Sequence, residues 1–138
     1  MLVRLAHRSL SVPIVGRFFA SVLKYFNGLL TGSDVAPAAV IGQRFFMPHP
    51  QGVVIGPRVV IGADCVVMQG VTLGEAKGKD GRLGNPHIGD GVFIGPGAVI
   101  VGPVDVGDGA RIGANTYIAW DVSAGDTWVG ASARKLEI

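Results

Sequence analysis

The chain has 138 residues, and this length predicts a single domain. Hydrophobic residues make up 49% and charged residues 16%, a balance that excludes a disordered tail or linker. One cysteine, Cys65, excludes a disulfide framework and a cysteine-based zinc site, and the formal net charge of +2 gives no indication of nucleic acid binding.

Residues 1–33 are predicted to form an N-terminal helical arm of two short helices. Ser11 can cap a helix that carries Pro13 in its first turn, and apolar residues then recur near the helical period until Gly28 and Gly32 end it. The arm contains four basic residues and no acidic one, whereas the rest of the chain contains eight basic and ten acidic residues. We find no stretch long and uncharged enough to cross a membrane.

The arm has two interpretations. In the first, its apolar stripe packs on the body of the protein or on a sister subunit. In the second, the arm lies as a cationic amphipathic helix on an anionic membrane surface. We expect a cytoplasmic protein, which on the second interpretation is peripheral to the inner face of the membrane.

Residues 34–138, the second predicted domain, contain a six-residue repeat. An aliphatic residue returns at every sixth position in three runs, which are separated by a two-residue slip and by one longer break. A second, mostly small apolar residue follows four positions after most of them. The runs are Val35, Ile41, Met47 and Val53; Ile55, Ile61, Val67 and Leu73; and Ile88, Ile94, Ile100, Val106, Ile112 and Ile118.

A period of six fits neither an α-helix nor a β-hairpin sheet, but it fits a triangular parallel β-helix. Each unit forms one flat side and a turn, three units form a coil, and the coils stack about 4.8 Å apart. The repeat therefore predicts an all-β prism of about four to five coils, with the aliphatic residues inside. Because such a prism has a narrow core and flat outer faces, we expect a homotrimer with clefts between the prisms.

Residues 74–87 interrupt the repeat as an inserted loop. The spacing from Leu73 to Ile88 is not a multiple of six, and the stretch between them is polar, glycine-rich and charged. Long loops without structure of their own are uncommon in compact domains and are often functional. We expect this loop to lack regular structure and to protrude from the prism.

His49 is the first candidate for chemistry. It lies just before the two-residue slip and two positions after an inward-facing one, so its side chain is not forced into the core. Asp34 precedes it by slightly less than the three repeat units of one coil, which predicts that Asp34 lies nearly beneath His49. A carboxylate there would orient the imidazole and stabilise its protonated form. A structural role for this histidine is the alternative at this point.

Three stretches resemble the serine acetyltransferase branch of the hexapeptide-repeat acyltransferases. They are Asp34-Val35-Ala36-Pro37-Ala38-Ala39-Val40-Ile41-Gly42, His49-Pro50-Gln51-Gly52-Val53-Val54-Ile55-Gly56 and Gly70-Val71-Thr72-Leu73-Gly74. The resemblance extends from about residue 4 to the end of the chain. It implies a left-handed β-helix, a trimer, acetyl-CoA as donor and O-acetylation of a hydroxyl group. By the same resemblance His49 is the general base and Asp34 its partner carboxylate.

The chain departs from that branch around the acceptor. Pro48 stands where the family has an aspartate, and Gly84-Asn85-Pro86 stands where it has Arg-His-Pro. The arginine that would hold a substrate carboxylate is therefore absent. The stretch Asn85-Pro86-His87-Ile88-Gly89 looks more like acetyltransferases of exopolysaccharide and capsule biosynthesis. We therefore expect a sugar or polysaccharide precursor as acceptor, contacted by Asn85, His87 and Arg82, with L-serine as the alternative.

The resemblance also implies where the donor binds. The pantetheine arm of acetyl-CoA would lie along small-residue turns at Gly74, Gly95, Pro96, Gly113 and Ala114. The phosphates would meet Arg134 and Lys135 near the end of the chain, with Lys77, Lys79 and Arg82 in the inserted loop as alternatives.

These parts predict a direct transfer. His49 removes the proton of the acceptor hydroxyl as that hydroxyl attacks the acetyl carbonyl, and backbone N–H groups stabilise the oxyanion. A thioester is already activated, so we expect no metal requirement and no acyl-enzyme. Cys65 occupies an inward repeat position, which favours a core residue over a nucleophile.

Two other classes of protein share such a prism. A zinc hydratase of the γ-carbonic anhydrase type needs three histidines, whereas the repeat region holds only His49 and His87. A non-catalytic trimeric scaffold is the other class, and binding of acetyl-CoA would argue against it.

Overall fold

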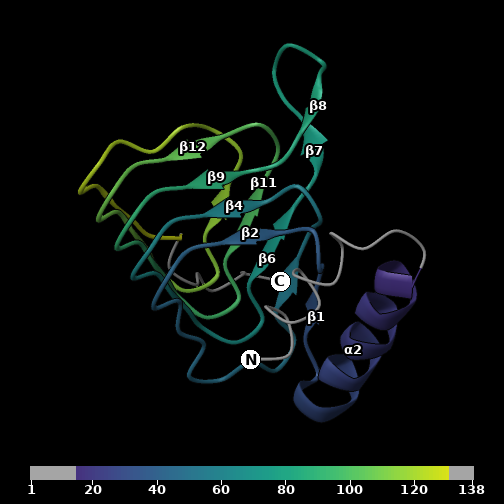
Figure 1. Ribbon diagram of the computed structural model, residues 1–138. Coiled ribbons are helices and arrows are strands. Elements are labelled where there is room, and N and C mark those ends of the chain that lie inside the picture. Colours follow the sequence, from purple (N-terminus) through teal and green to yellow (C-terminus); the bar gives the residue numbers. More distant parts are fainter. Residues whose placement is uncertain (1–14, 131–138) are drawn as a thin grey trace, which may run out of the picture.

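The computed structural model describes residues 15–130, which form one helix beside a triangular prism of short parallel strands (Figure 1). The helix α2 spans Val15–Thr31, and a hairpin of β7 (Ala76–Lys77) and β8 (Leu83–Gly84) projects from the prism. The strands of the prism are β1 (Asp34–Val35), β2 (Val40–Ile41), β3 (Val54–Ile55), β4 (Val60–Ile61), β5 (Val66–Val67), β6 (Thr72–Gly74), β9 (His87–Ile88), β10 (Phe93–Ile94), β11 (Val99–Val101), β12 (Asp105–Val106), β13 (Arg111–Ile112), β14 (Tyr117–Ile118) and β15 (Thr127–Trp128).

Three parallel sheets form the faces of the prism. The first sheet has the order β1-β3-β6-β11-β14, the second β2-β4-β9-β12, and the third β5-β10-β13-β15. Strands that follow one another in the chain belong to different sheets, so each turn of the chain contributes to all three faces. This arrangement confirms the triangular parallel β-helix that the six-residue period predicts.

The residue pairs along the first sheet give the length of each coil. Asp34 pairs with Val54, and Val54 pairs with Thr72, so the first coil is longer than the second. Thr72 pairs with Val99 across the coil that carries the hairpin. The excess of the first coil over the second is the two-residue slip seen in the sequence, and it is accommodated in the turn before β3.

The core consists of one inward side chain from each strand of the prism except β15, together with mostly small apolar side chains from the turns. The predicted inward residues are buried, except that Ile41 and Met47 in the first coil are only partly covered because no earlier coil stacks on them. Val59, Cys65, Val92, Ala98 and Ala110 fill the turns and are inaccessible to solvent. The narrow interior explains why aliphatic and small residues dominate and aromatic residues are scarce.

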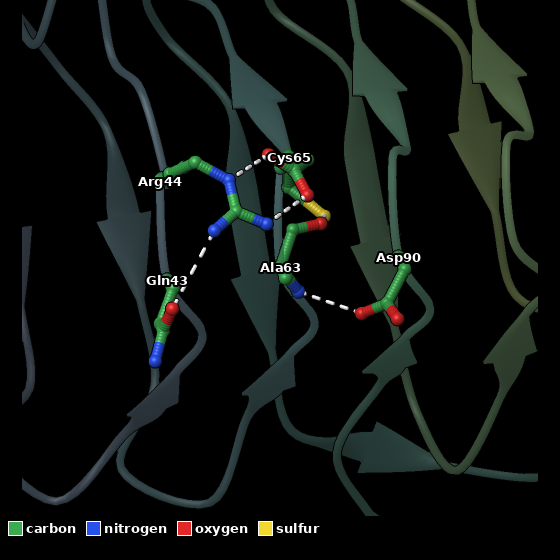
Figure 2. A network of polar contacts seen from close by, with 6 residues as sticks. Gln43, Arg44, Ala63, Cys65 and Asp90 are labelled. Carbon is green, nitrogen blue, oxygen red and sulfur yellow. Dashed lines mark hydrogen bonds and ion pairs between the residues drawn. The ribbon is translucent and has the colours of Figure 1, made fainter.

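One corner of the prism, between the second and third sheets, is held by side chains that link successive coils (Figure 2). The Arg44 guanidinium donates to both carboxylate oxygens of Asp64 at 2.5 and 2.6 Å. The Asp90 carboxylate accepts the Ala63 N–H at 2.7 Å. Cys65 lies inside this corner, with its sulfur 3.1 Å from the Gly89 carbonyl oxygen. Cys65 is inaccessible to solvent, which confirms the expectation that it is a core residue, and this burial raises the pKa of its thiol.

The helix α2 turns its polar side toward the prism. Lys24 forms an ion pair with Asp34, and the buried Asn27 amide donates to the Ser33 hydroxyl at 3.0 Å. Its large apolar side chains face outward instead, and they are half to almost three-quarters exposed: Phe18, Phe19, Tyr25, Phe26, Leu29 and Leu30. The expectation that the apolar stripe packs on the body of the same chain is therefore wrong for these residues.

At the end of α2, the expectation is confirmed for Gly32 and wrong for Gly28. The helix continues through Gly28 and ends at Thr31, after which Gly32 adopts a φ of 65° and donates its N–H to the Gly28 carbonyl at 2.8 Å. Such a left-handed residue is a common helix C-terminus. The start predicted at Ser11 and Pro13 lies outside the described residues. Within the described part of the chain, no helix is long and apolar enough to span a membrane.

The inserted loop protrudes from the prism as expected, but it has structure of its own (Figure 1). Ala76 pairs with Gly84 and Lys77 with Leu83 in an antiparallel ladder. The tip is closed by the Gly81 N–H, which donates to the Gly78 carbonyl at 2.9 Å. The repeat rule gives no signal for this hairpin, because its pairing is local and antiparallel whereas the prism is parallel.

Candidate active site

His49 lies on an exposed turn that leads into β3. The Gly52 N–H donates to the Gly32 carbonyl, and the Gly70 N–H donates to the Gln51 carbonyl, both at 2.9 Å. Gly52 has a φ of 69°, a conformation that a side chain would strain. Proline precedes and follows His49 and restricts its backbone further. The imidazole is therefore exposed to solvent on a turn whose backbone is held by hydrogen bonds to neighbouring segments.

Asp34 lies at the start of β1, on the outer face of the first sheet. In the backbone register of the sheet it pairs with Val54. The expected approach of the Asp34 carboxylate to the His49 imidazole stays a prediction. The Asp34 carboxylate contacts the Lys24 ammonium of α2 at 2.6 Å. The backbone contact of Gly52 with Gly32 holds the turn of His49 against the segment that leads into Asp34.

The turns between the third and first sheets stack into one edge of the prism, which we call the His49 edge. The Gly97 N–H donates to the Gln69 carbonyl at 2.9 Å, and the Asn115 N–H donates to the Pro96 carbonyl at 2.8 Å. Small residues let successive coils approach here, since a Cβ on Gly95 would come within 2.8 Å of the Ala114 nitrogen. Four of the predicted donor residues lie along this edge: Gly95, Pro96, Gly113 and Ala114.

The remaining predicted donor residues lie elsewhere. Gly74 ends β6 at the start of the hairpin, on the edge between the first and second sheets. Arg134 and Lys135 lie outside the described residues. The fold thus brings Gly95, Pro96, Gly113 and Ala114 to one edge and separates Gly74 from them.

Asn85 follows the hairpin on the edge between the first and second sheets, which we call the Asn85 edge. Its Oδ1 lies 3.3 Å from the point where a Cβ of Gly56 would be. This oxygen is buried and has no hydrogen-bond partner within residues 15–130. The Asn85 amide lies 3.5 Å from the Glu75 carboxylate, which is also ion-paired with Arg58. The Asn85 Oδ1 is therefore a buried hydrogen-bond acceptor without a partner among these residues, and it lies near the ion pair of Arg58 and Glu75.

Gly84, at the foot of the hairpin, is closely covered by Pro103. A Cβ on Gly84 would lie 2.4 Å from the Pro103 Cβ, far inside van der Waals contact. No side chain fits at position 84 without displacing the hairpin or the proline. Sequence reasoning missed Pro103, since nothing in the repeat pattern indicates that a residue of a later turn packs on the hairpin.

His87 and Arg82 lie apart from each other and from His49. His87 points outward from β9, with its Nδ1 3.4 Å from the Asp105 Oδ1 on the adjacent strand. Arg82 lies at the tip of the hairpin, where its guanidinium contacts Asp80 at 2.5 Å. The backbone N–H of Arg82, and after it this guanidinium contact, holds the pKa of the Asp80 carboxyl below its ordinary value.

Within one chain the candidate residues therefore occupy two edges. His49 and the small-residue turns lie on the His49 edge, and Asn85 with the hairpin lies on the Asn85 edge, with the whole first sheet between them. A site that uses both groups is incomplete in a single chain. Across the described residues, no three His, Cys, Asp or Glu side chains are grouped as a metal site would require.

Two families of hexapeptide-repeat transferases match the prism. Residues 52–76 match the hexapeptide repeat of succinyl-transferase, and residues 85–119 match the bacterial transferase hexapeptide of six repeats. These matches and the solved structures below identify the prism as a left-handed β-helix, as the resemblance implied.

Among curated proteins, the serine acetyltransferase of Helicobacter pylori strain J99 is 40% identical over 119 residues, which cover 86% of this chain and 69% of the relative. The serine acetyltransferase of Synechocystis is 42% identical over 135 residues, which cover 96% of this chain and 52% of the relative. The expected likeness to exopolysaccharide and capsule acetyltransferases is thus not what these relatives show.

Solved structures lead to the same family. The soybean serine acetyltransferase complexed with serine has a TM-score of 0.83 and 38% identity, covering 96% of this chain and 54% of that one. A serine acetyltransferase in complex with CoA has a TM-score of 0.83 and 34% identity, covering 96% and 53%. The chain spans about half the length of these proteins and of the Synechocystis relative. From the prism, its repeats and these matches we conclude that the chain belongs to the serine acetyltransferase family.

Proposed function

We propose that the chain is an acetyl-CoA-dependent O-acetyltransferase whose catalytic domain comprises residues 34–138. One observation carries this proposal: an exposed imidazole, that of His49, heads an edge along which small residues line successive coils. Such an edge suits an extended donor, because its pantetheine arm can approach the backbone closely there. The solved relative in complex with CoA supports the choice of donor.

In the proposed reaction, His49 acts as general base. It accepts the proton of the acceptor hydroxyl as the hydroxyl oxygen attacks the acetyl carbonyl. The carbon–sulfur bond of the thioester then breaks, and the imidazolium gives the proton to the leaving CoA thiolate. Asp34 acts as a positioning residue. Only its Oδ1 contacts the Lys24 ammonium, so the carboxylate can accept from the imidazole through its other oxygen at the same time.

We propose L-serine as the first acceptor to test. The relatives are named serine acetyltransferases, and one solved structure is a complex with serine. This reverses the order expected from the sequence, in which a sugar comes before serine.

A sugar or another neutral hydroxyl compound is the second candidate, and one specific observation favours it. Residue 84 is a glycine, so no arginine is present there to bind a substrate carboxylate. Pro103 also fills the space where a side chain at position 84 would start. Position 84 therefore offers no charged partner for a substrate carboxylate, and a neutral hydroxyl compound needs none.

We further propose that the active protein is a homotrimer in which the His49 edge of one copy meets the Asn85 edge of the next. The separation of these two edges within one chain supports this arrangement. The outward apolar face of α2 would be covered in the same assembly, and a membrane surface is the alternative. Light scattering and co-sedimentation with anionic vesicles distinguish these two.

The test is the release of CoA from acetyl-CoA with L-serine and with a panel of neutral sugars, at equal acceptor concentrations. Turnover with serine supports the first acceptor, and turnover with a sugar alone supports the second. If no acceptor is acetylated and acetyl-CoA does not bind, the proposal is wrong and the prism is a scaffold.

A further inference from the structure

The open end of the hairpin brings two polar side chains opposite each other. Ala76 of β7 pairs with Gly84 of β8, so the ladder places Glu75, just before Ala76, across from Asn85, just after Gly84. The Asn85 Nδ2 lies 3.5 Å from the Glu75 Oε2. The register of the hairpin therefore holds Glu75 at the Asn85 edge, next to the proposed acceptor.

A third polar side chain reaches the same place from the preceding coil. Arg58 lies in the turn between β3 and β4, and its guanidinium Nη2 forms an ion pair with the Glu75 Oε2. This turn lies against the foot of the hairpin, because the Asn85 Oδ1 is 3.3 Å from the point where a Cβ of Gly56 would be. We call Arg58, Glu75 and Asn85 the Glu75 cluster.

The Glu75 cluster contains one cation and one anion, and they are paired with each other. Both remain accessible, since 69% of the Arg58 side chain and 36% of the Glu75 side chain are exposed. Arg82, the other arginine expected near the acceptor, is also paired, with its Nε 2.5 Å from the Asp80 carboxylate. Each of these two arginines therefore already has a carboxylate partner within the chain.

A carboxylate on the acceptor would meet a like charge in this cluster. To bind Arg58 it would have to lie beside the Glu75 carboxylate, or displace Glu75 and leave it without its cation. Juxtaposed like charges are a general means by which a site rejects a ligand. We propose that Glu75 is a specificity-determining residue, which neutralises Arg58 and excludes acceptors with a carboxylate next to the reacting hydroxyl.

A neutral compound with neighbouring hydroxyl groups fits the same cluster. Within residues 15–130, the Oε1 of Glu75 and the Nε and Nη1 of Arg58 have no hydrogen-bond partner. A hydroxyl group both donates and accepts, so one hydroxyl can donate to Glu75 while its neighbour accepts from Arg58. This inference rests on the proposed function, and of its two acceptors it favours the sugar-like one.

The first experiment compares acceptors that differ in a carboxylate. One pair is the neutral sugar with the highest rate in the panel and its uronic acid, and the other is L-serinamide and L-serine. For each pair, CoA release gives the ratio of kcat/KM without the carboxylate to kcat/KM with it. The wild type should have a ratio above one, and Glu75→Gln, which keeps the shape and removes the charge, should lower it about fivefold or more.

Three further variants show that the effect comes from charge at this place. Arg58→Gln leaves Glu75 without its cation, so the ratio should rise. The double variant Arg58→Gln/Glu75→Gln has neither charge, and its ratio should lie between those of the two single variants. Asp64→Asn removes the carboxylate that pairs with Arg44 on the edge between the second and third sheets, and it should leave the ratio unchanged.

The ratio separates specificity from a structural role. If Glu75 only held the foot of the hairpin, Glu75→Gln would lower the rates with both members of a pair and leave their ratio unchanged. Arg58→Gln, at a more exposed position, keeps the test valid if Glu75→Gln fails to fold, because it predicts a change in the opposite direction.

The outcomes distinguish this inference from the proposed function. If acetyl groups are transferred but Glu75→Gln has the wild-type ratio, the inference is wrong and the proposed function stands. A wild type that prefers the carboxylate-bearing members, with a KM that rises in Arg58→Gln or Lys77→Gln, would assign a carboxylate clamp to one of these cations and overturn the inference.

A binding measurement covers the case in which nothing is acetylated. The proposed function then fails, and calorimetry with L-serine and L-serinamide tests the charge preference separately. Tighter binding of L-serinamide that Glu75→Gln abolishes would support selection of ligands by Glu75. Equal binding of the two compounds by the wild type would overturn it.

Discussion

Gly84 and Pro103 lie so close together that a Cβ on Gly84 would come within 2.4 Å of the Pro103 Cβ. This contact brings the foot of the hairpin onto the next coil and leaves no space for a side chain. It is also the point at which the resemblance to serine acetyltransferases leads one to expect an arginine. Gly84 stands in place of that arginine, and Pro103 occupies the space that a side chain at this position would need.

Gly84→Ala should lower the free energy of unfolding by about 1–3 kcal/mol, because overpacking forces backbone or side-chain shifts. Pro103→Gly in the same chain should recover most of that loss. Urea unfolding of both single variants and the double variant gives the coupling between the two positions.

Gly74→Ala is the matched control for this cycle. A Cβ at Gly74 would meet no atom closer than 3.9 Å, so its effect on stability should be small. Equal losses in Gly74→Ala and Gly84→Ala, or no recovery in the double variant, would contradict the packing described here.

Ile55→Ala should destabilise the prism by about 2–5 kcal/mol, because it deletes a fully buried side chain from a narrow core. The neighbouring residue in β3, Val54, points outward and is 40% exposed, whereas Ile55 is 1% exposed. Val54→Ala should therefore cost much less. The urea midpoints of the two variants test whether Ile55 faces inward and Val54 outward. Similar losses of stability in both variants would mean that these faces of β3 are wrongly assigned.

The ion pair of Arg44 and Asp64 should make a pH-dependent contribution to stability. Hydrogen bonds from Arg44 lower the pKa of the Asp64 carboxyl below its ordinary value of 3.8. Because the folded pKa is the lower one, the contribution is present at neutral pH and is lost as the pH falls through that lowered pKa.

Asp64→Asn should therefore lower the urea midpoint at neutral pH, and the difference from the wild type should shrink in acid. Asparagine suits the test because it tolerates the positive φ of 58° at this position. A difference that stays constant down to the lowest pH at which the protein is folded would show that the ion pair does not stabilise the corner.

The core could be predicted from the sequence because it depends on one local rule, an inward residue at every sixth position. Ile88, Ile94 and Ile100 illustrate it, since each follows the period and each is fully buried. The register of the first coil could not be predicted in the same way. The slip before β3 changes which residues of neighbouring coils lie side by side, so Asp34 meets Val54.

The orientation of α2 and the packing of Pro103 on Gly84 could not be predicted from the sequence either. The helical period of α2 indicates an apolar face but not the neighbour that covers it, and hydrogen bonds of Asn27 and Ser33 turn the opposite face to the prism. Pro103 reaches Gly84 only because the hairpin folds back on the next coil. Contacts of this kind depend on turn geometry, which a repeat pattern does not record.

Mixing of inactive copies tests whether the site is shared between chains. If His49 and Asn85 act across an interface, co-expressed His49→Ala and Asn85→Leu chains should form some sites with both native groups. Random assembly in a ring predicts activity in roughly a quarter of the sites. A mixture as inactive as its two components would place both groups in one chain, whereas an Asn85→Leu protein that is active by itself would exclude Asn85 from the site.

The central claim is that His49 removes the proton of the acceptor. The most direct measurement is the rate of CoA release by the wild type and by His49→Ala, each with and without added imidazole. A general base contributes about 10²–10⁴-fold, so His49→Ala should lose that factor while keeping its fold and its affinity for acetyl-CoA, and imidazole should restore part of the rate. A His49→Ala protein that releases CoA at the wild-type rate would contradict the account.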